Sequence, residues 1–133
     1  MNGAGCADLT GVWLGLYSYP RRFDPVGFTA ILIETAGTIS GSSHEDHRQA
    51  PFRARRVFAT LCGRHSESAV EFVKTYDDGR PHSRPISYEG SLMDDGAEIE
   101  GRWTISRMWS GRFLMIRFAP NAEAVIRRKY ERA

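Results

Sequence analysis

The chain is poor in cysteine and in long apolar runs, and each shortage excludes a class of protein. Its 133 residues include two cysteines, Cys6 and Cys62, which form neither a CxxC pair nor a disulfide framework. Reduced thiols are therefore expected, as in the cytoplasm. No apolar run is long enough to cross a bilayer as a helix, and residues 1–5 lack the basic and apolar regions of a signal peptide. These shortages predict a soluble cytoplasmic protein with no membrane partner.

The chain also has little excess of charge. Its 18 basic residues oppose 16 acidic ones, and only Lys74 and Lys129 among the basic residues are lysines. A net charge of +2 argues against a nucleic-acid partner, so the arginine clusters at 21–22, 53–56 and 127–129 are expected on solvated faces. Phosphate-binding glycine loops are absent as well, and the sequence predicts no cofactor.

A regular alternation of apolar and polar residues is what the sequence does contain. Eight segments alternate in this way, separated by clusters of glycine, aspartate, serine and proline: 11–19, 26–35, 38–45, 54–62, 68–76, 85–93, 97–106 and 112–118. Short connections such as Thr35-Ala36-Gly37 have the composition of hairpin turns. The polar stretch 42–56 is the exception, and we expect a long loop there between the third and fourth strands.

Sequential hairpins without intervening helices predict an all-β fold. Closure of the sheet removes the exposed edges that an open sheet would leave. We therefore expect a single domain over residues 1–133, folded as an eight-stranded antiparallel up-and-down β-barrel with a short C-terminal helix.

The first, second and last segments are apolar on both faces. In a closed barrel these strands are neighbours, so their outward residues would form one apolar wall: Leu14, Leu16, Ile31, Ile33, Leu114 and Ile116. A wall of this kind needs a cover. The tail 120–132 follows a capping Asn121 with apolar residues at helical spacing, which predicts an amphipathic helix on the wall: Ala122, Val125, Ile126 and Tyr130. The interface of a homo-oligomer is the other cover, and the two are compatible.

The opening Leu9-Thr10-Gly11-Val12-Trp13 resembles the Gly-x-Trp start of the first strand in calycins, the group of the lipocalins, fatty-acid-binding proteins and avidins. In those barrels the tryptophan closes one end and a basic residue on the last strand packs over it. The resemblance gives that place to Arg117, as a cation–π partner of Trp13. It implies a calycin-like barrel that holds a small molecule in its mouth.

The avidins are the most similar calycins. Their third, sixth and seventh strands resemble Ile39-Ser40-Gly41, Tyr88-Glu89-Gly90 and the segment around Trp103. Gly15, however, stands where avidins carry a polar side chain that binds the ureido group of biotin. Because glycine supplies no such group, the resemblance implies the barrel and no biotin site.

The predicted barrel would have a lumen rich in aromatic rings with a few polar tips: Trp13, Tyr17, Tyr19, Phe72, Lys74, Tyr76, Tyr88, Trp103 and Arg117. Rings with sparse polar anchors are typical of a small-molecule pocket, and Lys74 is placed to fix an anionic group. We therefore expect a non-catalytic protein that binds an apolar or aromatic ligand in the lumen. The alternatives are a filled barrel that serves as an oligomeric structural or interaction module, and an enzyme that uses Lys74 or a histidine.

His44-Glu45-Asp46-His47 is the one short cluster with metal-ligand residue types. On a strand His44 and Asp46 would share a face and His47 would not, whereas on a loop all could converge. Without a spaced third ligand the pattern favours a solvated loop, and metal binding stays open. No residue lies in a nucleophile-elbow pattern, so no catalytic residue is predicted.

Overall fold

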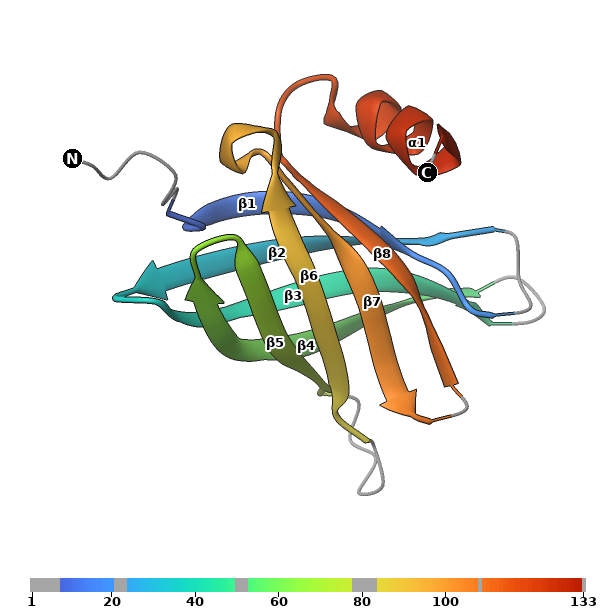
Figure 1. Ribbon diagram of the computed structural model, residues 1–133. Coiled ribbons are helices and arrows are strands. Elements are labelled where there is room, and N and C mark those ends of the chain that lie inside the picture. Colours follow the sequence, from blue (N-terminus) through green and yellow to red (C-terminus); the bar gives the residue numbers. More distant parts are fainter. Residues whose placement is uncertain (1–7, 21–23, 50–52, 78–83, 108, 133) are drawn as a thin grey trace.

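The computed structural model describes residues 8–20, 24–49, 53–77, 84–107 and 109–132. The segments with alternating apolar and polar residues form eight antiparallel strands. Each strand pairs with the next, and the last pairs back to the first, which closes the barrel (Figure 1). The strands are β1 Gly11–Tyr17, β2 Val26–Thr35, β3 Thr38–Gln49, β4 Arg53–Ser66, β5 Ala69–Tyr76, β6 Ile86–Met93, β7 Glu98–Ser106 and β8 Trp109–Arg117. A 3-10 turn, η1 Asp94–Gly96, joins β6 to β7, and the helix α1 Ala122–Arg132 follows β8.

The predicted long loop at 42–56 is wrong. Within this stretch β3 continues to Gln49 and β4 begins at Arg53, and the two strands pair throughout, from Thr38 opposite Arg64 to Gln49 opposite Arg53. The alternation continues here with polar residues on both faces, since Glu45 is buried inside the barrel and Asp46 is exposed outside. A polar residue at an inward-facing strand position interrupts the apolar–polar alternation, so the sequence there resembles a loop. In the fold it belongs to a buried charge cluster.

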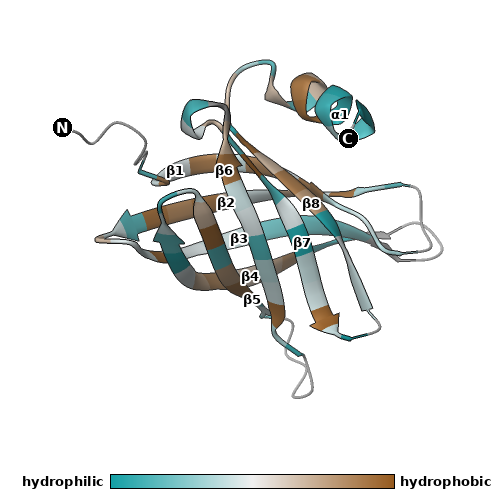
Figure 2. Cartoon of the chain, viewed as in Figure 1, coloured by the Kyte–Doolittle hydropathy of each residue, from teal (hydrophilic) through white to brown (hydrophobic). Residues whose placement is uncertain are grey.

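The predicted C-terminal helix is confirmed and covers one side of the apolar wall. Figure 1 shows α1 lying over β1 and β8, and Figure 2 shows apolar stretches in these elements. The buried residues at this contact are Ala122, Ile126 and Tyr130 of α1 and Leu16, Leu114 and Ile116 of the barrel. Tyr130 also anchors the end of the helix, because its hydroxyl donates to Ser18 Oγ at 2.6 Å and its carbonyl accepts from Arg112 Nη2 at 2.9 Å.

The rest of the wall has no cover among the described residues. Val12, Ile31, Ile33 and Phe118 are 41%, 49%, 52% and 60% exposed. Val12 is paired with Ile31, and the amide of Phe118 donates to the carbonyl of Val12 at 2.9 Å, so the four side chains belong to adjacent strand positions. We call these four residues the outer stripe.

Docking of α1 predicts a measurable loss for one helix substitution. Ile126→Ala removes a side chain that is 2% exposed from the contact with Leu16 and Leu114, and it is expected to lower the free energy of unfolding by about 3 kcal/mol. Arg128→Ala, on the exposed face of the same helix, is the matched control and should change it by less than about 0.5 kcal/mol. Urea unfolding followed by circular dichroism measures both, and equal effects would show that α1 does not pack as described.

One end of the barrel is closed by the Trp13–Arg117 pair that the resemblance implied. The Arg117 guanidinium lies 4.6 Å from the centre of the Trp13 ring, and its Nε donates to the Gly96 carbonyl at 2.9 Å. Trp13 Nε1 in turn donates to the carbonyl of Leu9, a fully buried residue. We call this the closed end, and the opposite end, where β1 finishes and β8 begins, the mouth.

A hydrogen bond between a histidine and a carboxylate adds to the closed end. His65 Nδ1 lies 2.8 Å from Glu34 Oε1, and the same oxygen accepts the Leu9 amide at 3.0 Å.

Cys62 is an exposed free thiol on the outside of the barrel, while Cys6 lies outside the described residues. No helix among the described residues is long and apolar enough to span a membrane.

Candidate functional site

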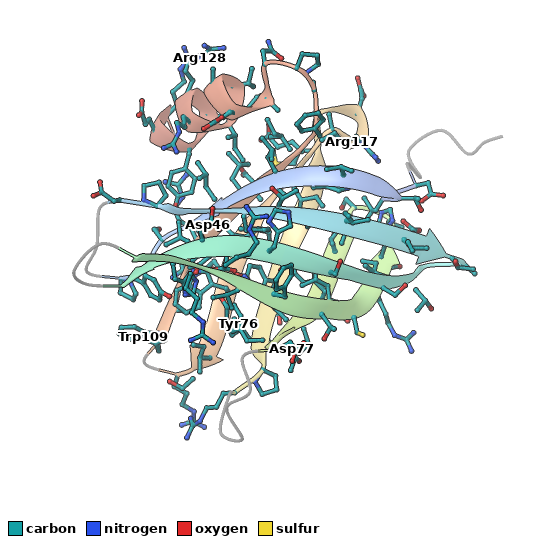
Figure 3. All side chains as sticks on the ribbon, turned by 180° about the vertical axis from the view of Figure 1, so that it is seen from behind. Asp46, Tyr76, Asp77, Trp109, Arg117 and Arg128 are labelled. Atoms are coloured by element: carbon teal, nitrogen blue, oxygen red, sulfur yellow. The ribbon has the colours of Figure 1, made fainter. Side chains whose placement is uncertain are left out.

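The predicted lumen residues separate into three levels along the barrel. Arg117 and Trp109, at the two ends of β8, indicate the closed end and the mouth in Figure 3. Trp13 and Arg117 lie at the closed end, as described above. Phe72 and Tyr88 lie in the middle, and the remaining predicted residues lie toward the mouth: Tyr17, Tyr19, Lys74, Tyr76 and Trp103. Whether they bind a ligand stays a prediction.

The middle of the lumen is packed with aromatic rings. Phe72 stacks on Tyr88 with ring centres 4.8 Å apart, and Phe113 meets Tyr88 edge to face at 4.9 Å. Phe28 fills the position beside Gly15, where an added Cβ would lie 2.0 Å from its ring. The inward space beside Gly15 is therefore occupied by a phenyl ring. Side chains thus fill the middle of the lumen.

A buried charge pair forms the floor of the mouth. Lys74 on β5 donates to Glu45 Oε1 on β3 at 2.5 Å, and the two side chains are 1% and 0% exposed. Three more groups bond to the same carboxylate: the Tyr17 hydroxyl donates to Oε2 at 2.5 Å, Tyr76 is 3.2 Å from both oxygens, and His47 Nε2 is 2.7 Å from Oε2. The lumen Lys74 is thus paired, and the anion it was predicted to hold is Glu45 of the same chain.

Aromatic rings enclose the ammonium group of Lys74. Its Nζ lies 5.0 Å from the Tyr17 ring centre, 4.9 Å from those of Phe28 and Tyr76, and 5.7 Å from that of Tyr88. Ring faces attract a cation, and the attraction strengthens where water is excluded. The cage and the carboxylate together offset the desolvation of a buried lysine.

Burial and pairing act on the protonation of both partners. Burial lowers the pKa of Lys74 below its usual range, and the nearby Glu45 carboxylate opposes this shift. Burial alone would raise the pKa of Glu45, but the attraction of Lys74 and the hydrogen bonds from Lys74, Tyr17 and His47 outweigh it and hold that pKa below its usual value. Glu45 is therefore a carboxylate with its accepting positions filled.

The phenols beside this carboxylate resist ionisation. Burial, followed by repulsion from Glu45, raises the pKa of Tyr17 and Tyr76 well above 10.0. Burial also raises the pKa of Tyr88, with repulsion from Tyr76 and Glu45 as smaller causes. A group with a raised pKa in the fold stabilises the fold fully below its unfolded pKa, and this contribution is lost as the pH rises beyond it.

The stability of the barrel is consequently expected to fall as the pH rises above 10.0, the unfolded value for these tyrosines. Of the five tyrosines in the chain, Tyr17, Tyr76 and Tyr88 should ionise only as the barrel unfolds. Tyrosinate absorbance and far-ultraviolet circular dichroism, recorded in one alkaline titration, test this. Ionisation of all five tyrosines with the sheet signal intact would contradict the buried hydroxyl network.

A pocket of about 630 Å³ lies at the rim of the mouth, between the start of β2, the end of β3 and α1. We call it the mouth pocket; the described residues that line it are Tyr17, Tyr19, Asp24, Pro25, Val26, Gly27, Asp46, His47 and Arg127. The Tyr19 ring is 5.7 Å from that of Trp103 and 6.0 Å from that of Trp109, which is 41% exposed. Aromatic surface and polar groups thus meet at one solvent-accessible place.

Two of the groups at this site were weighed in the sequence only as metal-ligand types and were not predicted to line the lumen. Glu45 and His47 lie in the stretch that was predicted as a loop, and their inward direction follows only once β3 is extended to Gln49. An inward Lys74 was the available signal, because a buried ammonium group requires an acid nearby.

The metal-ligand types in residues 44–47 do not converge. His44 contacts Phe58 on the outside of the barrel, and Asp46 bonds to Arg56 at 3.2 Å, whereas His47 bonds to Glu45 inside. The residues that the structure describes contain no group of three histidine, cysteine or acidic side chains arranged to hold a metal ion.

Comparison with known proteins supports the class of fold. No family model matches the sequence, and no curated protein does. A solved structure of a redesigned beta barrel is similar, with a TM-score of 0.70 at 9% sequence identity over 87% of this chain and 96% of that chain. Likeness at this identity shows the fold alone: the chain is a closed eight-stranded antiparallel up-and-down β-barrel with one short C-terminal helix.

Proposed function

We propose that this protein is a non-catalytic, calycin-like barrel that binds a small apolar or aromatic molecule in its mouth pocket. The observation that carries the proposal is the mouth pocket itself, where the rings of Tyr17 and Tyr19 lie beside the polar edge of His47. Concave aromatic sites with a few fixed polar groups are the usual form of small-molecule pockets. The Trp13–Arg117 stack at the closed end supports the calycin-like part of the proposal.

The arrangement of Lys74 favours binding over catalysis. Its amine is paired with Glu45 at 2.5 Å and enclosed by four rings, so a substrate in the mouth pocket has no direct path to it. A catalytic lysine or general base needs contact with the reacting atoms. The cluster serves instead as a rigid floor that holds Tyr17 and His47 in place.

Native mass spectrometry of the purified protein tests the proposal. The expected spectrum shows the chain with a bound small molecule. If the purified protein is empty, it is expected to take up a small molecule on incubation with aromatic compounds. Tyr19→Ala should weaken this complex because it removes ring surface from the mouth pocket, while Val73→Ala, on the outside of β5, should not. A bare chain under all these conditions would contradict a binding function.

The outer stripe favours a second candidate function, a self-associating module. Val12, Ile31, Ile33 and Phe118 expose apolar surface on neighbouring strands, and contiguous surface of this kind is typical of interaction sites. The same mass spectra report the number of subunits. This candidate predicts an oligomer that Ile31→Asp converts to a monomer, and a wild-type monomer at all concentrations would contradict it.

A further inference from the structure

His65 lies at the closed end with an acceptor against each of its ring nitrogens. Its Nδ1 is 2.8 Å from Glu34 Oε1, and its Nε2 is 2.8 Å from the carbonyl oxygen of Glu67. The side chain is 4% exposed, so both contacts are shielded from water. Because a carbonyl oxygen can only accept a hydrogen bond, the contact with Glu67 requires a proton on Nε2.

The contact with Glu34 requires a proton of its own. A neutral imidazole that carries its proton on Nε2 has only a lone pair on Nδ1. An ionised Glu34 has only lone pairs on Oε1, and the amide of Leu9 already donates to that oxygen at 3.0 Å. The 2.8 Å separation of Nδ1 and Oε1 is therefore a hydrogen bond only when one proton lies between the two atoms. This holds whether the ring or the carboxyl group carries the proton.

The same carboxyl group holds the segment that precedes β1. We call residues 8–10 the strap. Glu34 Oε1 accepts from the Leu9 amide, and the Glu34 amide donates to Thr10 Oγ1 at 2.9 Å. Leu9 is fully buried, and its carbonyl accepts from Trp13 Nε1 at 2.9 Å. The strap is thus attached to the barrel through the carboxyl group that shares the proton.

His65 also joins two hairpin turns that contain unfavourable backbone angles. Ala36, between β2 and β3, has a φ of 51°, and Glu67, between β4 and β5, has a φ of 55°. Residues with a Cβ rarely adopt this left-handed region. The His65 amide donates to the carbonyl of Gly37 at 2.8 Å, and its ring holds the carbonyl of Glu67. Loss of the shared proton therefore weakens a junction between the strap and both turns.

Three further charged side chains lie near this junction. Asp8 is exposed, its carboxylate accepts from the Thr10 amide at 2.8 Å, and its charge attracts that of a protonated His65. The Arg117 guanidinium donates to the carbonyls of Asp8 and Thr10. The Glu67 carboxylate belongs to an exposed residue, and only its backbone carbonyl bonds to the histidine ring.

We propose that His65 and Glu34 form a proton-dependent latch, which holds the strap at the closed end and loosens as the pH rises above neutral. Imidazole exchanges its proton with solvent around neutral pH. The closed latch retains a proton that an open end releases more readily. The latch is therefore fully held at lower pH, and its stability is lost as the pH rises. Loosening uncovers Leu9 and the indole of Trp13, which are both fully buried. The inference goes beyond the proposed function, because it involves no ligand.

Hydrogen exchange of the Leu9 amide, followed by nuclear magnetic resonance from about pH 6 to about pH 8.5, tests the latch. Linkage to one proton lets the opening equilibrium increase by up to about tenfold for each pH unit. After correction for the intrinsic exchange rate, the protection factor of Leu9 should fall at least about tenfold over this range. The ring nitrogen signals of His65 should shift over the same range. The Asp77 amide, which donates to the Phe58 carbonyl at the mouth, is the internal control and should keep its protection.

Two matched variants assign the effect to the pair. Glu34→Gln should remove the pH dependence of Leu9 protection, because an amide N–H donates to the Nδ1 lone pair and no shared proton is needed. Glu67→Gln removes a nearby exposed carboxylate but keeps the backbone carbonyl, so the fall should persist. Constant protection of Leu9 in the wild-type protein would overturn the latch. An equal fall in Glu34→Gln, or His65 signals that shift without any change at Leu9, would overturn it as well.

Discussion

Replacing Lys74 with methionine is expected to lower the free energy of unfolding by about 4 kcal/mol at neutral pH. The substitution leaves the fully buried Glu45 either charged without its cation or protonated, because burial raises the pKa of this carboxyl once the attraction of Lys74 is removed. Because the neutral acid is the better-tolerated form, the loss should shrink as the pH approaches 4. Urea unfolding at several pH values, with midpoints and slopes compared, measures the effect.

Two further variants distinguish the effect of breaking the buried pair on stability from the effect of removing any lysine. Lys129→Met breaks the partly exposed pair with Glu98, with a lysine side chain 40% exposed, and is expected to cost less than about 1 kcal/mol. Glu45→Gln combined with Lys74→Met removes both charges and keeps an acceptor for Tyr17, so it should recover much of the loss. If Lys74→Met costs no more than Lys129→Met, the buried pair is not part of the folded barrel.

The second large effect is expected at a glycine in the barrel wall. Gly101 on β7 lies opposite Gly90 on β6, and a Cβ added to Gly101 would lie 1.9 Å from the Glu89 carbonyl oxygen and 2.5 Å from Gly90 Cα. Both are backbone atoms, so the strands must separate to admit a methyl group. Gly101→Ala is expected to destabilise the barrel by about 3 kcal/mol.

Gly27→Ala is the matched control for this prediction. It makes the same exchange in the strand β2, but the nearest atom to the added Cβ is Leu16 Cδ2 at 3.7 Å, an ordinary contact. Alanine reduces the freedom of the unfolded chain, so this variant should be neutral or more stable by about 0.5 kcal/mol. Thermal unfolding of the two variants gives the comparison, and similar midpoints would mean that β6 and β7 do not approach as closely as described.

Most of the fold could be predicted from the sequence because its signals are local. Alternation with period two and hairpin composition indicated all eight strands, and helical spacing after Asn121 indicated α1. Strand ends were less certain, since an inward polar residue breaks the pattern on which the prediction depends. Residues 42–56 show this clearly: the polar cluster that interrupts the pattern is stabilised by Lys74, some thirty positions away along the chain.

The candidate site could be predicted only in part for a related reason. Its aromatic members, such as Tyr17 and Tyr76, followed from strand parity. Glu45 and His47 did not, because their direction depends on the length of β3 and their roles depend on Lys74, which only the closed barrel brings beside them. The predicted partner of Lys74 therefore changed, from the anionic group of a ligand to Glu45 of the same chain.

In the proposed function, a ligand binds at the mouth of this barrel and not at its closed end. The chain has three tryptophans. Trp103 and Trp109 contact Tyr19 at the mouth, while Trp13 donates to Leu9 at the closed end. Nuclear magnetic resonance of the three indole N–H signals during titration with 2-phenylethanol, a small aromatic probe, tests this most directly. Binding at the mouth is expected to shift the signals of Trp103 and Trp109 and to leave the signal of Trp13 unmoved. No shift at any ligand concentration, or the largest shift at Trp13, would contradict it.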